Sequence, residues 1–483
     1  MRKRSSRRGR WVAAFSAAAT LPLLLIPATA ATADAPAAST KQLEAVAFSG
    51  PANLDRARTT AALKAGRSLA SLGLQEAGRH PAPTLASYNQ KLHARATQAA
   101  HAAVTGVRPS ATVPPFDPTK EPPEITLSDC PDPAQGGGPL YEPDRFDMCE
   151  VRTFGISEYL VVDGTPTLQG VGYFTDTLIG LAGFGDHADR LLSFEDHISN
   201  VSQRIYGLWN PAITLFGASQ CTPVLGSGDC HSRTDAHIAT FAQWLLAGGD
   251  SWNFTLEVEP GGGVGRDDII KEVLNEGFFV HPPPGYSDPH PDELLPMPDL
   301  DLRWDNASYV KAGDDSDGAA IFDDIPPLTY NLHGQGTDQV AAHIQYALAN
   351  PDATIPKEPA GHTKTLPGYF DNPLHRLYAK YSLPRSQLRY DRNRYLATKQ
   401  CGPRHGDECD EFPMTSTYEG AAKADVEPFS DPYAYSVRLV NKTQNGTAGT
   451  IAKLFYAYYR VLDPGFDINN HPRDWDSFYI QIL

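Results

Sequence analysis

The chain has 483 residues, of which 41% are hydrophobic, 20% charged and 10% aromatic, with 41 prolines and 40 glycines. This composition excludes wholesale disorder, collagen-like repeats and coiled coils, and the length allows two or three folded units. The formal net charge of −16 is unfavourable for nucleic-acid binding over the whole surface, because phosphate affinity comes from cations. Any nucleic-acid site must therefore be local and assisted by a metal.

Residues 1–33 have the order of a secretory signal peptide. Six basic residues precede an apolar stretch from Trp11 to Ile26, and small-residue cleavage sites follow it. No other stretch reaches the roughly 18 apolar residues of a membrane helix. We therefore expect a secreted, extracellular protein without a transmembrane segment. Removal of residues 1–33 leaves 35 basic residues (41 less six) against 57 acidic ones, a net charge of −22.

The next segment, 34–124, is rich in Ala and ends in a Pro-rich run from Pro109 to Pro123. Its first part has the Ala, Leu, Arg and Gln content of helices but few large apolar residues. The prolines favour an extended spacer over a packed element. We expect a helical pro-region or linker here.

Residues 125–355 consist of short apolar or alternating runs separated by turn residues. Asp163-Gly164 lies between two such runs and is a hairpin signal. This texture predicts a mainly-β middle domain, sandwich-like in architecture. Its role is open.

Residues 357–483 have a mixed pattern, which predicts a separate α+β domain. The expected helices are 374–381, 390–398 and 450–461, and the expected strands are 436–440 and 478–482. The whole chain is thus predicted to be multidomain.

The six cysteines indicate disulfides, since the chain is expected to be exported. Six cysteines allow 15 connectivities, and spacing alone does not choose among them. We expect local pairing, because each pair of neighbours lies in one Gly-, Pro- or Asp-rich loop region; a zinc site is the weaker alternative. The pairs are Cys130 with Cys149, Cys221 with Cys230 and Cys401 with Cys409.

The densest group of potentially reactive residues is the run 409–420, Cys-Asp-Glu-Phe-Pro-Met-Thr-Ser-Thr-Tyr-Glu-Gly. Asp410, Glu411 and Glu419 lie within ten residues, and Pro413 and Gly420 break the segment into turns. Carboxylates brought together repel each other unless a divalent cation lies between them. The alternative is an acidic surface loop closed by a disulfide.

A basic stretch precedes this acidic run. Between residues 372 and 405 there are eight basic residues and one acid, Asp391. Cations that hold backbone phosphates, followed by carboxylates that hold an ion, are what a metal-dependent phosphodiesterase needs. The cations that we expect to contact DNA phosphates are Arg389, Arg392, Arg394 and Arg404.

The run 409–420 resembles the signature of the NucA/NucB family of secreted bacterial deoxyribonucleases. Members carry Asp-Glu-aromatic-Pro followed by a Glu-Gly-Gly turn. Downstream, residues 438–440 and 444–446 resemble the family's strand and the turn that carries its Asn. The resemblance covers the C-terminal quarter of the chain.

The resemblance implies that residues 357–483 are a nuclease domain that cleaves DNA without sequence preference, using a divalent cation such as Mg²⁺ or Mn²⁺. It implies metal-binding roles for Glu411 and Glu419, and catalytic roles for these two and for Asp410, Asn445 and Asp391.

Two departures from the family pattern leave other interpretations open. Ala421 stands where the family has a second Gly, and Gln444 stands where an acid precedes the turn Asn. The alternative function is an extracellular or cell-wall binding protein, in which the β-rich domain attaches to cell-wall or matrix polymer and the nuclease domain is degenerate. A third interpretation makes residues 34–107 an inhibitory pro-region. His375 is expected to be structural.

Overall fold

The computed structural model describes residues 40–78, 81–105, 124–130, 140–183, 189–228, 230–232, 236–310, 318–334, 336–427 and 429–483. By its contacts the chain divides into Met1–Thr40 and Lys41–Leu483, and the elements below all belong to the second unit. The expected signal peptide and the Pro-rich run 109–123 lie outside the described residues.

The larger of two extended sheets has the strand order β12-β1-β4-β5-β6-β10-β8, with β2 paired to β1 and β3 paired to β4. All of these pairs are antiparallel except β1 with β12. The bounds are β1 (Lys41–Pro51), β2 (Gln75–Glu76), β3 (Leu140–Tyr141), β4 (Asp147–Val162), β5 (Thr165–Ala182), β6 (Leu191–Ile205), β8 (His231–Ser232), β10 (Asp250–Glu257) and β12 (Tyr286–Ser287).

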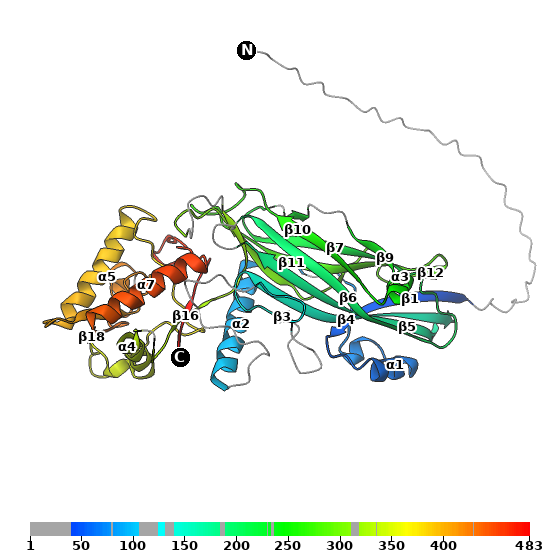
Figure 1. Ribbon diagram of the computed structural model, residues 1–483, viewed down its shortest axis with the longest axis horizontal. Helices are drawn as coiled ribbons and strands as arrows, with labels where there is room; N and C mark the ends of the chain where they lie inside the picture. The colour runs from blue at the N-terminus through cyan, green and yellow to red at the C-terminus, as the bar shows by residue number, and fades with distance from the viewer. Residues whose placement is uncertain are drawn as a thin grey trace, which may run out of the picture. The chain divides into compact units, whose positions relative to one another are not determined.

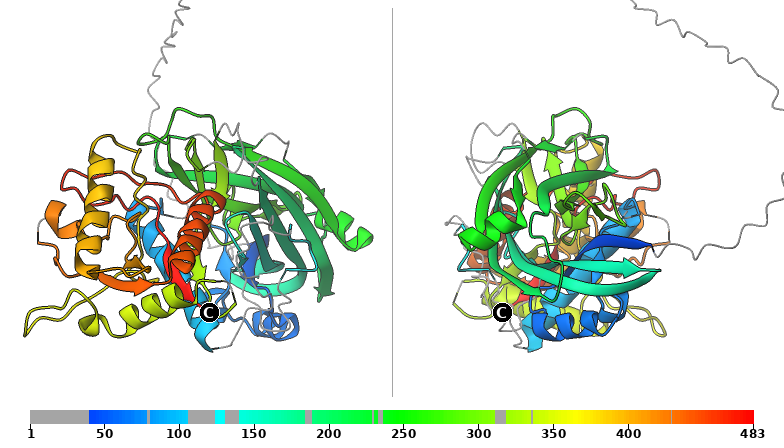
Figure 2. Two further views of the ribbon diagram at one scale, coloured as in Figure 1. Left: turned by 60° about the vertical axis from the view of Figure 1, so that its left-hand side comes forward. Right: turned by 90° about the vertical axis from the view of Figure 1, so that its right-hand side faces the viewer.

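The second sheet has the order β15-β14-β11-β7-β9, with β13 on β11. Figure 2 shows the two sheets curling around a common interior. The bounds are β7 (Thr214–Leu225), β9 (Ile238–Thr240), β11 (Ile270–His281), β13 (Leu295–Pro296), β14 (Leu300–Asp305) and β15 (Ala319–Phe322).

One apolar core fills the space between the sheets, so the prediction of a mainly-β, sandwich-like region is confirmed. Phe154 and Phe174 of the first sheet stack with ring centroids 5.1 Å apart, and Phe278 of the second meets both rings edge-on. The predicted hairpin joins β4 to β5: Asp163 has φ 49° and Gly164 has φ 80°, as a tight turn with two positive φ values requires.

Part of segment 34–124, which was expected to be a pro-region or linker, is a strand of the larger sheet. β1 pairs with β4 along its whole length, from Lys41 with Val162 to Pro51 with Arg152. Phe48 faces Gly155 across this pair, and a Cβ at Gly155 would lie 2.1 Å from the Phe48 ring. The absent side chain thus makes room for a fully buried ring.

Helices from the N-terminal third pack on the sheets, which confirms their predicted helical character (Figure 1). Tyr88 of α2 donates a hydrogen bond to Asp323 (2.9 Å), and Asn89 donates to Asp474 (2.8 Å), so α2 contacts residues on both sides of the predicted domain boundary. The elements are α1 (Arg56–Lys64), η1 (Ala70–Leu72) and α2 (Leu85–Thr105); a further short helix, α3 (Phe241–Ala247), follows β9 in the β-rich part.

The C-terminal part is α+β, as predicted, but it begins before residue 357. β16 pairs in parallel with β19, and α4 contributes Val340 and Ile344 to the same core as Phe455 and Phe478. Its elements are β16 (Pro327–Tyr330), α4 (Asp338–Ala349), η4 (Pro351–Ala353), α5 (Arg385–Cys401), β17 (Glu408–Phe412), α6 (Lys423–Val426), β18 (Ser436–Val440), α7 (Lys442–Tyr458) and β19 (Tyr479–Ile482).

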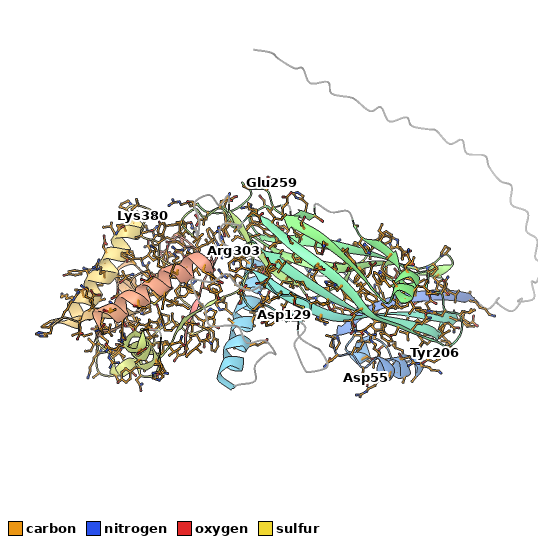
Figure 3. All side chains as sticks on the ribbon, viewed as in Figure 1. Asp55, Asp129, Tyr206, Glu259, Arg303 and Lys380 are labelled. Atoms are coloured by element: carbon orange, nitrogen blue, oxygen red, sulfur yellow. A yellow bond between two sulfur atoms is a disulfide. The ribbon has the colours of Figure 1, made fainter. Side chains whose placement is uncertain are left out.

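A network of buried ion pairs joins the β-rich and C-terminal parts. Asp476 accepts a hydrogen bond from Arg145 (2.7 Å) and forms an ion pair with Arg303 (2.7 Å), and Arg460 pairs with Asp305 of β14. Arg303 lies where the strands of the second sheet meet the C-terminal part (Figure 3). Removing one partner of such a buried pair costs about 3–5 kcal/mol, so the two parts stabilise each other.

Three disulfides join Cys130 to Cys149, Cys221 to Cys230 and Cys401 to Cys409, which confirms the predicted local pairing. Disulfides are typical of proteins that fold in an oxidising compartment. Among the helices that the structure describes, none combines the length and the apolar character needed to cross a membrane.

Candidate active site

The acidic run of the sequence forms strand β17 and the turns that follow it. β17 pairs with β18 so that Asp410 lies opposite Arg438 and Phe412 opposite Ser436. The Cys401–Cys409 disulfide joins the end of α5 to this strand, with Cα atoms 5.9 Å apart. The basic helix and the acidic strand are therefore held side by side by a covalent bond.

Asp410 is buried in a hydrogen-bonded chain with His343 and Ser436. Its Oδ2 lies 2.6 Å from Nδ1 of His343, and Nε2 of His343 lies 2.8 Å from Oγ of Ser436. All three residues are at most 7% exposed. The arrangement fixes α4 against both strands and removes Asp410 from contact with solvent, which makes it a positioning residue.

Glu419 forms a second histidine–carboxylate pair, with His375. Its Oε1 lies 2.9 Å from Nδ1 of His375, and its Oε2 accepts from the His375 backbone N–H at 2.9 Å. Burial alone would raise the pKa of Glu419, but the facing ring and these hydrogen bonds outweigh burial and lower it. Burial would likewise lower the pKa of His375, and Glu419 raises it instead.

This geometry changes the roles expected for both residues. Because each carboxylate oxygen of Glu419 is hydrogen-bonded to His375, Glu419 is better placed to orient the imidazole ring of His375 than to hold a metal ion. Nε2 of His375 has no hydrogen-bond partner among the described residues, and the side chain is 16% exposed. A carboxylate that binds Nδ1–H fixes the tautomer whose Nε2 accepts a proton.

Glu411 is the acidic residue of the run that faces the exposed cations. It is half-buried and accepts a hydrogen bond from the Thr415 hydroxyl. Burial, and then the neighbouring Asp410, raise the pKa of Glu411 to about 8, while Arg394 and Arg404 act in the opposite direction. A bound cation would favour its ionised form.

The four arginines expected to contact DNA divide into three kinds. Arg389 is 2% exposed and is bonded to Glu427 and to the Tyr418 carbonyl, so it is structural, contrary to expectation. Arg392 is exposed but paired with Asp425 at 2.5 Å. Arg394 and Arg404 are exposed.

Asp391 and Asn445 are hydrogen-bonded to residues other than Glu411. Asp391 is exposed on α5 and accepts a hydrogen bond from Gln387 one turn earlier (3.0 Å). Asn445 lies in the first turn of α7 and donates to Glu408 (3.3 Å) and to the Cys409 carbonyl (3.5 Å). Both therefore support local structure.

The two departures from the family pattern also have structural roles. Gln444 lies in α7, where the resemblance predicted a turn, and its Oε1 accepts from the Gln339 backbone N–H at the start of α4 (2.7 Å). Ala421 is buried in a small cluster with Cys409 and Ala397. Neither residue is bonded to Glu411 or His375.

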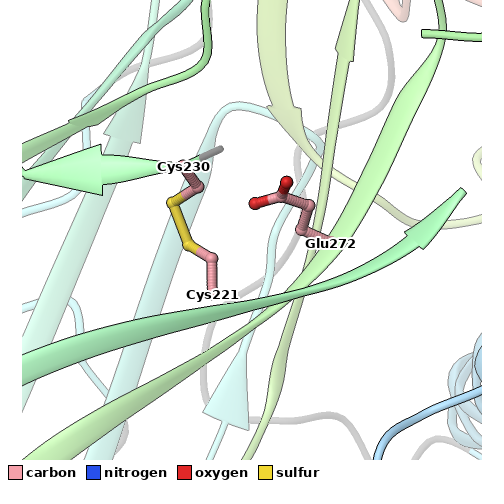
Figure 4. Close-up of side chains that lie close together, drawn as sticks. All are labelled: Cys221, Cys230 and Glu272. Carbon is pink, nitrogen blue, oxygen red and sulfur yellow. A yellow bond between two sulfur atoms is a disulfide. The ribbon is translucent and has the colours of Figure 1, made fainter. Parts of the chain in front are cut away.

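Glu411 belongs to neither group of three potential metal ligands found among the described residues. The ligand atoms of each group lie within 4.8 Å of one another, and both groups lie in the β-rich part. In one of them Glu272 points towards Cys221 and Cys230, whose sulfurs are joined in a disulfide and so are not thiolate ligands (Figure 4). Mg²⁺ is commonly held by one or two carboxylates together with substrate phosphate and water, so a metal site at Glu411 would have this carboxylate as its protein ligand.

In comparisons with known proteins, no family profile, no curated protein and no solved structure matches the chain.

Sequence reasoning missed His343, because the predicted domain boundary placed α4 in the β-rich domain. The sequence did contain a pattern that points to His343 as a buried residue. Val340, Ile344 and Ala347 have the spacing of one helix face, and His343 lies on that face. A histidine on the buried face of a helix needs partners, and here they are Asp410 and Ser436.

Proposed function

We propose that the protein is a secreted, metal-dependent endonuclease that hydrolyses phosphodiester bonds of extracellular DNA. The observation that carries the proposal is the half-buried Glu411, which interacts electrostatically with the exposed Arg394 and Arg404. The same C-terminal part holds His375, whose Nε2 is free to accept a proton. Tyr390 interacts electrostatically with Glu411, and Tyr456 with Tyr390 and Glu419.

The residues divide the work of hydrolysis. Arg394 and Arg404 bind backbone phosphates and bring the scissile group to Glu411. Glu411 holds a hard divalent cation, Mg²⁺ or Mn²⁺, which polarises the phosphate as a Lewis acid. His375 takes a proton from the attacking water at Nε2, the water oxygen bonds to phosphorus, and the bond from phosphorus to the leaving oxygen breaks. Glu419 keeps the ring oriented and stabilises its protonated form.

Plasmid nicking by the full mature chain tests this proposal. We expect cleavage with Mg²⁺ or Mn²⁺ and none with EDTA. Glu411→Gln and His375→Gln should each lower the rate by about 10²-fold or more, as expected for a metal ligand and a general base. Asp391→Asn is the matched control and should keep the wild-type rate, because its carboxylate contacts only Gln387.

Two outcomes would contradict the proposal. Wild-type nicking by both Glu411→Gln and His375→Gln would remove the site from catalysis. No cleavage by folded, oxidised wild-type protein with either cation would favour the alternative of a binding protein with a degenerate nuclease part. The full chain is needed, because a chain truncated to residues 357–483 lacks β16 and His343.

A further inference from the structure

Four carboxylates lie inside the apolar core of the β-rich part, far from any solvent. Glu150 comes from β4, Asp176 from β5, Asp196 from β6 and Glu276 from β11. Each of them is at most 2% exposed. Three strands of one sheet and one strand of the other therefore direct acidic side chains into a region that is otherwise built from Phe, Leu and Trp.

The strand register places the first three on the inner face of their sheet. Arg152 pairs with Asp176, and Leu178 pairs with both Glu150 and Asp196. Directly paired residues point to the same face, as do residues two apart on one strand. That face also carries Phe154, Phe174 and Phe194, which are members of the core between the sheets.

Glu276 approaches the same place from the second sheet. It lies between Leu274 and Phe278 on β11, both of which belong to that core. One oxygen from each of Asp176, Asp196 and Glu276 lies within 4.8 Å of the other two. Glu150 interacts electrostatically with Asp176 and Glu276. The group thus bridges the two sheets.

These carboxylates lack the hydrogen bonds that buried polar groups normally have. Both oxygens of Glu150, Asp176 and Asp196, and Oε2 of Glu276, have no hydrogen-bond partner in the described part of the chain. Arg152 lies nearby, with its Nε 3.8 Å from Glu150, and Lys91 interacts electrostatically with Glu150. Ionised carboxylates in an apolar core are strongly destabilising unless protons or a cation neutralise them.

Protons and a metal cation are the two ways to neutralise the group. Burial raises the pKa of Asp176 to about 8 and raises the pKa of Asp196, Glu276 and Glu150 well above the usual range. Asp176 and Asp196 are close enough to share one proton as a hydrogen-bonded pair. One shared proton can join only two carboxyls. Three carboxylates converge here, and the fourth, Glu150, also has no hydrogen-bond partner among the described residues, so a shared proton leaves two of the four without one.

The chemistry of the group selects the kind of cation. All of the donors are carboxylate oxygens, which suit hard cations, and neither His nor Cys takes part. Mg²⁺ keeps several water molecules in most protein sites, and the surroundings here are apolar side chains. Ca²⁺ accepts six to eight oxygens in flexible geometry and takes carboxylates in bidentate fashion.

We propose that Glu150, Asp176, Asp196 and Glu276 form a structural Ca²⁺ site that joins the two sheets of the β-rich part. Ca²⁺ and Arg152 together offset three of the four negative charges. The site is independent of the proposed nuclease function, because its residues lie between the two sheets and not at β17.

Metal analysis and refolding of the full mature chain test the proposal. The protein, with its disulfides intact, is unfolded in guanidinium with EDTA and refolded either with Ca²⁺ or with EDTA. We expect one tightly bound Ca²⁺ per chain by elemental and native mass analysis. We also expect a melting temperature about 3 °C higher with Ca²⁺, the scale of a ligand present at 100 times its Kd for a chain of this length.

Variants separate this site from other sources of Ca²⁺ binding. Asp196→Asn should lose the bound Ca²⁺ and the shift. Glu195→Gln is the matched control on the same strand; its half-exposed side chain pairs with His197, and Ca²⁺ binding should be unchanged. Glu411→Gln should also keep its Ca²⁺, which distinguishes this site from the proposed catalytic one.

Three outcomes would overturn the proposal. One is wild-type protein without bound Ca²⁺ that melts at the same temperature after both refolding treatments; the carboxyls would then be protonated. A second is Ca²⁺ binding retained by Asp196→Asn, and a third is Ca²⁺ lost by Glu411→Gln. If Asp196→Asn does not fold, the wild-type comparison decides alone.

Discussion

Replacing Asp476 by Asn should destabilise the β-rich and C-terminal parts together. Asp476 is buried, accepts hydrogen bonds from Arg145 (2.7 Å) and from the Leu462 backbone N–H, and forms an ion pair with Arg303 (2.7 Å). Asn keeps the size of the side chain and an oxygen for Leu462, but it removes the negative charge between two buried guanidinium groups.

The size of the effect follows from the pKa of Asp476. Burial alone would raise it, but Arg145 and Arg303 outweigh burial and lower it from 3.8 to about 2. At 1.36 kcal/mol per pKa unit, this difference corresponds to roughly 2 kcal/mol in favour of the ionised form. Loss of one partner from a buried pair costs about 3–5 kcal/mol. Because Asp323 remains 4.0 Å from Arg145, we expect the lower end, about 3 kcal/mol.

Urea unfolding followed by tryptophan fluorescence and far-ultraviolet circular dichroism measures this difference. Trp304 lies in the second sheet and Trp475 in the C-terminal part. We expect the fluorescence and the circular dichroism to change in one common transition. Because the pKa of Asp476 is lowered by folding, its contribution is present above pH 4 and is lost as the pH falls towards about 2. The gap between wild type and Asp476→Asn should therefore narrow over that range.

The exposed Asp371 provides the control. Asp371→Asn should change the free energy of unfolding by less than about 0.5 kcal/mol. A loss below about 1 kcal/mol for Asp476→Asn, or separate unfolding transitions for the two parts in the wild type, would refute the reasoning.

Three further predictions concern the candidate active site. In a pH–rate profile, the cleavage rate should rise with pH as His375 becomes neutral, with a midpoint above the ordinary histidine pKa of 6.5. Glu419→Gln should lower this midpoint, and an unchanged midpoint would exclude His375 as the base. Serine at both Cys401 and Cys409 should lower stability by about 2.5 kcal/mol, as expected for a short closed loop, and should slow cleavage; equal unfolding curves would contradict this. Arg394→Ala should weaken DNA binding at every sequence and flatten its salt dependence, which filter binding at several salt concentrations would measure; a change at some sequences only would argue against phosphate contact.

Local signals in the sequence predicted some elements closely. Strand 436–440 and the hairpin at Asp163-Gly164 were found where expected, because alternation and turn chemistry are properties of adjacent residues. The local disulfides were expected because each cysteine pair lies in one Gly-, Pro- or Asp-rich loop region. Within the run 409–420, the roles of Glu411 and Glu419 stay predictions.

Other elements depended on distant partners and were mispredicted. Residues 374–381 have a helical pattern but are extended, because Leu374 exchanges backbone hydrogen bonds with Phe478 and the Leu377 N–H bonds to the Ser416 carbonyl. The sequence of β1 resembles the rest of an Ala-rich segment, yet the strand pairs with β4 along its length and its Ala45 and Ala47 are buried. Tertiary contacts override local propensity in both cases.

The roles of the site residues were also decided by distant contacts. Arg389 looked like its exposed neighbours in the sequence, but it faces inward towards Glu427. His375 was expected to be structural, and its pairing with Glu419 spans 44 residues. Charge runs reveal which residues are present in a region, but not which side of a helix each one occupies.

The pairing of β16 with β19 has a consequence for the order in which the fold can be completed. Pro327 pairs with Tyr479 and Tyr330 with Ile482, and nearly all of the candidate active site lies between these two strands in the chain. Because synthesis starts at the N-terminus, β16 emerges long before its partner strand. The core that the two strands share therefore closes only after the intervening residues have emerged. If the proposed secreted nuclease is exported as an unfolded chain, its site would be completed outside the cytoplasm, where the DNA of its own cell is out of reach.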